Sequence, residues 1–103
     1  MNDKSAEIAK INDEYRKARQ GFMLTRGVSA LPDIAKVLSM VQDFSEFSED
    51  NDPYGEHDFG SFECFGEKLF WKIDYYDSAL EAWADPLEDE CHRVLTVMLA
   101  EEY

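Results

Sequence analysis

Apolar residues recur at helical spacing near the start of the chain. This spacing predicts a helix over residues 3–20. Its buried stripe repeats at three- and four-residue steps and consists of Ile8, Ile11, Tyr15 and Ala18. Asn2 or Asp3 can cap the start of this helix, and Gly21 can end it.

A second helical pattern predicts a helix from Pro32 to Asp43. Its apolar positions follow the i, i+3, i+4, i+7 rule and are Ile34, Val37, Leu38 and Val41. Proline is favoured at the first helical position, where Pro32 would stand, and Asp33 would fall in the first turn.

Other segments read as strands or loops. Residues 22–28 are short and partly β-branched and are predicted as a strand. Residues 92–100 are also predicted as a strand from their β-branched content, although they satisfy a helical stripe as well. Residues 44–58 contain Asn, Asp, Pro and Gly in turn-forming combinations and are predicted as a loop. Residues 78–91 remain ambiguous, because Pro86 interrupts any helix there.

A β-hairpin is the clearest local prediction. Phe59–Phe65 and Lys68–Asp77 flank Gly66-Glu67, which suits a two-residue type II′ turn with Gly first. On one face this register pairs Cys64 with Leu69, Phe62 with Trp71 and Gly60 with Ile73. On the other it pairs Glu63 with Phe70 and Ser61 with Lys72. The apolar face, including Trp71, is expected in the core.

These elements predict an α+β domain in the order α-β-α-β-β-β. We expect two helices packed on an antiparallel three- to four-stranded sheet with a central β-hairpin. The 103 residues fit one domain, with the N-terminal helix over residues 1–21 and the core over 22–103.

The charge is strongly negative and unevenly distributed. Asp and Glu number 23 against 10 Lys and Arg, a formal charge of −13. No Lys or Arg occurs between Lys36 and Lys68. A chain of this charge is not expected to bind nucleic acid or an anionic membrane directly, because their phosphates would repel it.

The location of the protein is expected to be cytoplasmic. The longest uncharged apolar run, Val94–Ala100, is far too short to span a membrane, and the first residues lack the apolar segment of a signal peptide. The two cysteines, Cys64 and Cys91, are interpreted as reduced thiols, and Cys64 is expected to be buried.

Three sequence blocks resemble a family of small bacterial proteins known only as a domain of unknown function. The blocks are DNDPYGEHDFG from Asp50 to Gly60, FWKIDYYD from Phe70 to Asp77 and RVLTVMLAEEY from Arg93 to Tyr103. With LTRGV from Leu24 to Val28, the resemblance spans about residues 22–103. It implies carriage on plasmids, phages and other mobile elements, a context of defence or counter-defence, and it implies no catalytic residue.

The acidic loop offers weak candidates for chemistry. An EF-hand starting at Asp50 would have Gly55 in place but Tyr54 and Ser61 where oxygen-rich ligands belong. Asp52, Glu56, His57 and Asp58 could form a metal-dependent or hydrolytic site, with His57 as acid or base. His57 instead packing the loop against the sheet is favoured, and no metal or cofactor is expected.

The favoured function is that of a small acidic inhibitor that binds a protein. A rigid array of carboxylates can imitate DNA phosphates, so the expected partner is a basic nucleic-acid-binding protein or nuclease complex, as for an anti-CRISPR or antirestriction protein. The expected binding residues are Asp43, Glu46, Glu49, Asp50, Asp52, Glu56, Asp58, Glu63 and Glu67.

Two alternatives remain open at this point. One is the small enzyme centred on His57. The other is an antitoxin-like protein that binds through an apolar patch around Tyr54, Tyr75 and Tyr76, with acidity serving solubility alone. A homodimer is also possible.

Overall fold

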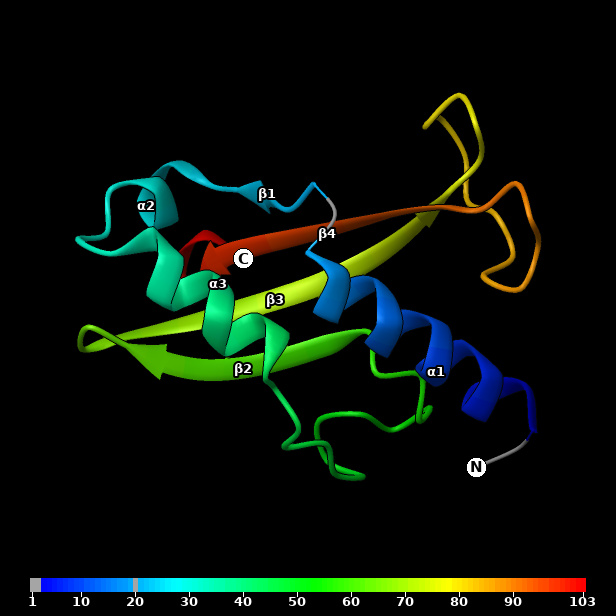
Figure 1. Cartoon of the computed structure of the whole chain (residues 1–103), viewed down its shortest axis with the longest axis horizontal. Coiled ribbons are helices and arrows are strands. Elements are labelled where there is room, and N and C mark those ends of the chain that lie inside the picture. The colour runs from blue at the N-terminus through cyan, green and yellow to red at the C-terminus, as the bar shows by residue number, and fades with distance from the viewer. Residues whose placement is uncertain (1–2, 20) are drawn as a thin grey trace.

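The computed structural model describes residues 3–19 and 21–103. The chain forms an α+β fold, as the sequence predicts (Figure 1). The helices are α1 (Asp3–Ala18), α2 (Arg26–Ser29), α3 (Ile34–Gln42) and the 3-10 turn η1 (Ala100–Glu102). The strands are β1 (Met23–Leu24), β2 (Phe59–Cys64), β3 (Glu67–Tyr76) and β4 (His92–Leu99).

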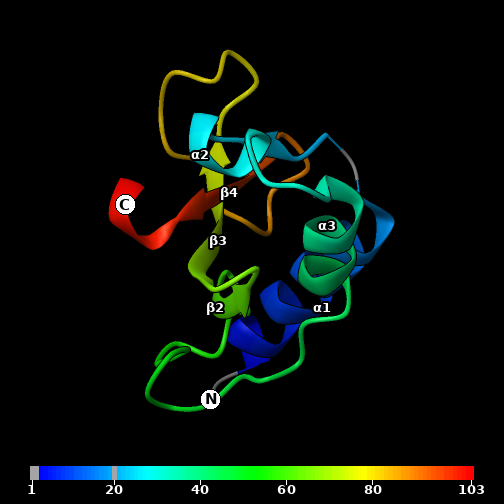
Figure 2. The ribbon, with the colours of Figure 1, turned by 90° about the vertical axis from the view of Figure 1, so that its left-hand side faces the viewer.

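The four strands form one sheet in the order β1-β4-β3-β2. β2, β3 and β4 pair antiparallel, whereas β1 pairs parallel with β4, so the expectation of a purely antiparallel sheet was wrong. Figure 2 shows α1 and α3 on the same side of this sheet, with η1 on the other. The β2–β3 hairpin therefore occupies one edge of the sheet rather than its centre.

The core lies between the sheet and the α1–α3 layer. Leu69, Trp71, Ile73 and Tyr75 alternate along β3 and are all buried, as a two-residue period requires. Val37 and Val41 of α3 and Ile8 of α1 join the same cluster. Cys64 is buried as expected, and Cys64 and Cys91 are both free thiols. No helix among the described residues is long and apolar enough to cross a membrane.

The predicted strand over 22–28 is correct only for Met23–Leu24, because Arg26–Ser29 forms the short helix α2. Hydrogen bonds to the Glu102 carboxylate explain why a helix replaces the predicted strand here. This carboxylate accepts hydrogen bonds from the Thr25 hydroxyl at 2.6 Å and from the Gly27 backbone N–H at 3.0 Å. The carboxylate thus accepts from a backbone N–H in the first turn of α2, that of Gly27, as a capping side chain does. A capping partner this distant in sequence leaves no local signal.

The two longer helices begin and end within a few residues of the predicted bounds. α3 starts at Ile34 rather than at Pro32, because Asp33 is its N-cap and accepts a hydrogen bond from the Lys36 N–H. The predicted strand over 92–100 is confirmed by β4. The proposed cap at Asn2 lies outside the described residues.

The predicted hairpin register was wrong by two residues. Phe62 pairs with Leu69 and Gly60 pairs with Trp71. The turn is Phe65-Gly66, whose φ angles of 56° and 74° are both left-handed, the signature of a type I′ turn rather than type II′. A shift of two residues preserves the faces, so the side chains expected in the core still point there.

Candidate functional site

A buried asparagine joins α1 to the loop and the sheet. Asn12 is fully buried, and its Nδ2 donates to the Glu56 carbonyl at 2.9 Å and to the Tyr75 hydroxyl at 2.8 Å. Arg93 Nε donates to Asn12 Oδ1 at 2.6 Å. The Tyr75 hydroxyl in turn donates to Glu56 Oε1 at 3.2 Å. This network fixes the position and direction of the Glu56 carboxylate.

His57 lies between two carboxylates. Its Nδ1 is 3.0 Å from Asp13 Oδ1, and its Nε2 is 3.6 Å from Asp52 Oδ2. The His57 backbone N–H also donates to Asp52 Oδ1 at 3.2 Å. The imidazole ring stacks on Phe47 with centroids 3.8 Å apart and planes 2° from parallel. His57 thus holds the loop onto α1, whereas it was expected from the sequence to pack the loop against the sheet.

Asp13 is shared between His57 and a buried arginine. Arg16 is 1% exposed; its Nη1 lies 3.0 Å from Asp13 Oδ1, and its Nη2 donates to the Phe44 carbonyl at 2.9 Å. The guanidinium carbon stands 5.0 Å from the Trp71 ring centroid, close enough for a cation–π contact. The chain thereby balances the buried charge with a carboxylate, a carbonyl and an aromatic face.

The His57 cluster is poorly arranged for acid–base catalysis. Both ring nitrogens face carboxylates of the protein, whereas a catalytic base needs one nitrogen within reach of a substrate proton. Glu56 and Asp58, the other members of the expected catalytic group, line a different site. Among the described residues, no group of three or more His, Cys, Asp or Glu side chains is arranged to hold a metal ion.

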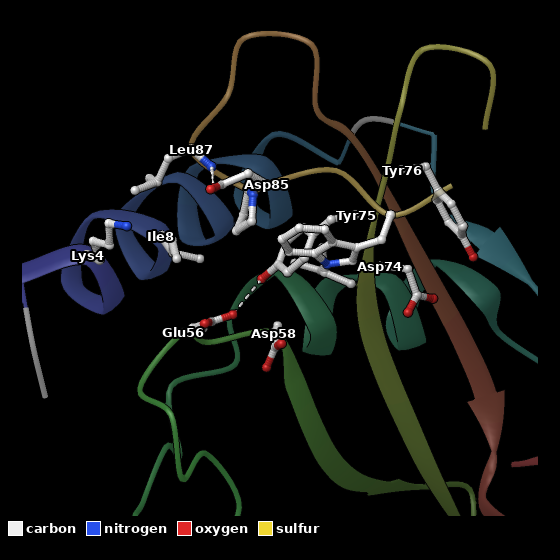
Figure 3. A pocket seen from close by; sticks show the side chains of 12 residues that line it. Lys4, Ile8, Glu56, Asp58, Asp74, Tyr75, Tyr76, Asp85 and Leu87 are labelled. Carbon is white, nitrogen blue, oxygen red and sulfur yellow. Dashed lines mark hydrogen bonds between the residues drawn. The ribbon is translucent and has the colours of Figure 1, made fainter. Parts of the chain in front are cut away.

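That different site is a cavity of about 590 Å³ at the end of β3, which we name the β3-end cavity (Figure 3). Four carboxylates line it: Glu56, Asp58, Asp74 and Asp85. Three aromatic side chains line it as well: Tyr75, Tyr76 and Trp83. The basic side chain at its rim is Lys4 of α1. The cavity therefore combines negative charge with aromatic walls, a combination suited to cations.

Burial changes the acidity of two groups in the β3-end cavity. Burial, together with the neighbouring Glu56 carboxylate, raises the pKa of Asp58 from its ordinary value of 3.8 to about 6. Burial also raises the pKa of Tyr75, which keeps its hydroxyl protonated as the donor to Glu56. A carboxylate whose ionised form is destabilised in this way marks a candidate functional site.

The structure separates the expected binding residues into three groups. Asp43, Glu46, Glu49 and Asp50 are exposed on the loop, and Glu63 and Glu67 are exposed on the hairpin. Asp52 is buried against His57. Glu56 and Asp58 are half-buried and line the β3-end cavity. The hairpin does not display a row of carboxylates, because Glu63 pairs with Lys68 across the strands.

Sequence reasoning missed several residues of both clusters. Asp13 lies 44 positions before its partner His57, and Asp85 comes from the ambiguous 78–91 segment. Asp74 and Trp83 were also not expected at a site. Each stands far in sequence from the acidic loop, so only the tertiary fold shows the contact. The one available signal was the acidic density of residues 77–90, six carboxylates in Asp77, Glu81, Asp85, Glu88, Asp89 and Glu90.

Comparison with known proteins agrees with the resemblance seen in the sequence blocks. A family model described as a protein of unknown function (DUF3768) matches residues 24–102. No similarity to a curated protein was found, and no solved structure matches either. The matched range includes the acidic loop, the hairpin and the β3-end cavity except for its α1 side.

Proposed function

The chain belongs to the DUF3768 family of proteins of unknown function, and from its geometry we propose that it is a protein-binding domain that takes a basic partner. The observation that carries the proposal is the β3-end cavity, which is lined by four carboxylates and one lysine, Lys4, while Lys72 pairs with one of the four, Asp74. Like charges held this close repel one another and reduce stability. A basic group from a partner would relieve that repulsion.

The exposed loop carboxylates support the same function. Asp43, Glu46, Glu49 and Asp50 stand on the surface of the segment that leads to the cavity. The loop itself is held in place by Asn51, which accepts from the Ser48 N–H and donates to the Glu46 carbonyl. Such a fixed negative surface would steer a positively charged protein towards the cavity and would make the association sensitive to salt.

The partner class we propose is a nucleic-acid-binding protein, and the consequence of binding is inhibition, as in an anti-CRISPR or antirestriction protein. Nucleic-acid-binding surfaces carry clustered Lys and Arg, which match this charge. Support for DNA mimicry comes from the loop and the cavity, and not from the hairpin, where Glu63 stands opposite Lys68. The apolar alternative loses support, because Tyr75 is buried in the core.

The proposal is tested by capture from a lysate of a bacterium that carries CRISPR and restriction systems. The tagged protein is washed through a salt series beside two variants. The loop variant carries Glu46→Gln, Glu49→Gln and Asp50→Asn, and the control variant carries Glu7→Gln, Glu14→Gln and Glu101→Gln. All six side chains are exposed, so both variants lose equal charge without disturbing the core.

We expect the wild type and the control variant to retain the same basic nucleic-acid-binding protein. Its retention should fall at high salt, in the loop variant and in the presence of competing duplex DNA. Capture of that protein equally by the loop variant, or retention that duplex DNA leaves unchanged, would refute charge mimicry.

A further inference from the structure

We propose that the β3-end cavity is the docking seat for a basic amphipathic segment of the partner protein. A Lys or Arg side chain of that segment enters the cavity, and an apolar neighbour packs on Trp83. This inference rests on the proposed function and specifies where and how the partner is held.

The charge of the cavity selects the kind of segment. Carboxylates approach it from three parts of the chain: Glu56 and Asp58 before β2, Asp74 on β3, and Asp85 after the 77–84 turn (Figure 3). Two positive charges stand against these four carboxylates: Lys4 lines the rim, and Lys72 lies 3.3 Å from Asp74 Oδ2. A neutral or acidic segment would leave this repulsion in place, whereas a guanidinium or ammonium group would be attracted both by the carboxylates and by the aromatic faces.

Trp83 provides the apolar half of the seat. Its side chain lines the cavity and yet is 70% exposed, an unusual position for a tryptophan in a protein without a partner. Leu80, on the same turn, is 56% exposed. Tryptophan is the residue type most enriched among side chains that dominate binding energy at interfaces.

The turn that carries Trp83 is fixed before the partner arrives. Trp83 forms a β-bridge with Tyr76. On either side of it, the Asp77 N–H donates to the Ala82 carbonyl at 2.8 Å and the Ala84 N–H donates to the Tyr75 carbonyl at 3.3 Å. The Asp77 carboxylate accepts from the Glu81 N–H at 3.0 Å. A backbone held in this way loses little conformational entropy on binding.

The docking seat also predicts that binding of the partner is coupled to the protonation of Asp58. The charges of Glu56, Asp52 and Asp74 act on Asp58. The same cavity is lined by Lys4 from α1, Tyr75 from β3 and Asp85 from the 78–91 segment, and Lys72 of β3 pairs with Asp74. The Asp58 pKa of about 6 means that part of the population is protonated in mildly acidic solution. An arriving cation favours the ionised form. Binding should therefore strengthen between pH 5 and pH 8 and should release protons in the lower part of that range.

The test uses a defined probe, a 12-residue amphipathic peptide of Arg and Leu, with a second peptide in which citrulline replaces each Arg. Binding is followed by tryptophan fluorescence, since Trp83 is exposed while Trp71 is fully buried. The seat variant carries Asp58→Asn and Asp85→Asn. Asparagine keeps an oxygen for the Leu87 N–H that Asp85 now binds. The matched control carries Glu88→Gln and Glu90→Gln, which are exposed on the same segment.

We expect the Arg peptide to shift the fluorescence of Trp83 to shorter wavelength and the citrulline peptide to leave it unchanged. The seat variant and Trp83→Ala should each weaken binding by about tenfold, while the control variant changes it less than about twofold. Trp83→Ala keeps only the buried Trp71, so a fluorescein label on the peptide reports its affinity.

The outcomes separate the docking seat from the proposed function. If the loop variant weakens peptide binding and the seat variant and Trp83→Ala do not, a basic partner is still supported and the seat is overturned. If citrulline replacement leaves the affinity unchanged, charge recognition fails and both proposals are overturned.

Discussion

The indole of Trp71 lies directly against Gly60, its cross-strand partner. A Cβ atom added at Gly60 would collide with Trp71 Nε1 and would stand 2.9 Å from Phe44 Cζ. Because Trp71 is fully buried and its ring is in contact with Arg16, Phe44 and Phe47, the ring has no space into which to move. The hairpin register therefore depends on glycine at this position.

Gly60→Ala should lower the free energy of unfolding by about 2 kcal/mol, because it overpacks the core beside Trp71. The measurement is chemical denaturation, with Ser61→Ala as the control, since Ser61 is the next residue on β2 and points to the other face. An unchanged denaturation midpoint for Gly60→Ala would contradict the close packing of Gly60 and Trp71.

Phe65→Asn should stabilise the protein by about 1 kcal/mol. Phe65 and Gly66 both have left-handed φ angles, 56° and 74°, and Asn-Gly is the sequence that a type I′ turn prefers. Gly66→Ala should have the opposite effect, because alanine resists positive φ. Thermal denaturation of both variants checks this pair of opposite shifts.

These two positions show why the hairpin was predictable in part. The two-residue alternation of Phe62, Cys64, Leu69 and Trp71 assigned each side chain to its correct face. That alternation is the same for any register that differs by two residues. The choice between these registers depended on the space that Gly60 leaves for Trp71. It also depended on Phe65, which stands in a turn position that normally takes Asn or Gly. Such a residue gives no turn signal in the sequence.

Arg16→Met should destabilise the protein by about 3 kcal/mol. Methionine preserves packing on Trp71, but it leaves Asp13 without its buried cation and the Phe44 carbonyl without its donor. Lys17→Met, one residue further along and exposed, should change stability by less than about 0.5 kcal/mol. Urea denaturation compares the two, and equal effects would refute a structural role for the Arg16–Asp13 pair.

Asp58→Asn should raise stability at pH 7 and weaken binding of a cation. The folded-state pKa of Asp58, about 6, lies above its ordinary value of 3.8, so the folded protein binds the proton more tightly than the unfolded chain. Asp58 therefore contributes to the free energy of unfolding below pH 4, where it is protonated. This contribution is lost as the pH rises through 6. Asparagine removes that loss, which is about 1 kcal/mol once solvent screening at this half-buried group is allowed for.

Urea denaturation at pH 4 and pH 7 measures this effect. The gain in Asp58→Asn should appear at pH 7 and vanish at pH 4. A variant that is more stable and yet binds the Arg peptide less well cannot owe its weaker binding to unfolding. Equal stability of wild type and variant at both pH values would show that Asp58 is not destabilised by its surroundings.

The sequence predicted the residues of the candidate site less well than it predicted the fold. The sequence indicated Glu56, His57 and Asp58 as neighbours of one site, but the chain turns at His57, whose φ is 55°. This turn sends His57 towards Asp13 on α1, while Glu56 and Asp58 line the cavity with Tyr75. No sequence pattern marks a histidine with a left-handed backbone conformation between two acidic residues. Adjacency in sequence therefore wrongly placed His57 in the same site as Glu56 and Asp58.

The N-terminal helix has a consequence for where the folding unit begins. The family match starts at residue 24, beyond α1, yet Asn12 of α1 satisfies Arg93 and Tyr75 inside the matched range. A chain cut to the matched range would expose the arginine, the tyrosine and Trp71 to water at once. Boundaries drawn from similarity would thus yield a fragment prone to aggregate, and expression of this protein should retain residues 3–23 with the rest.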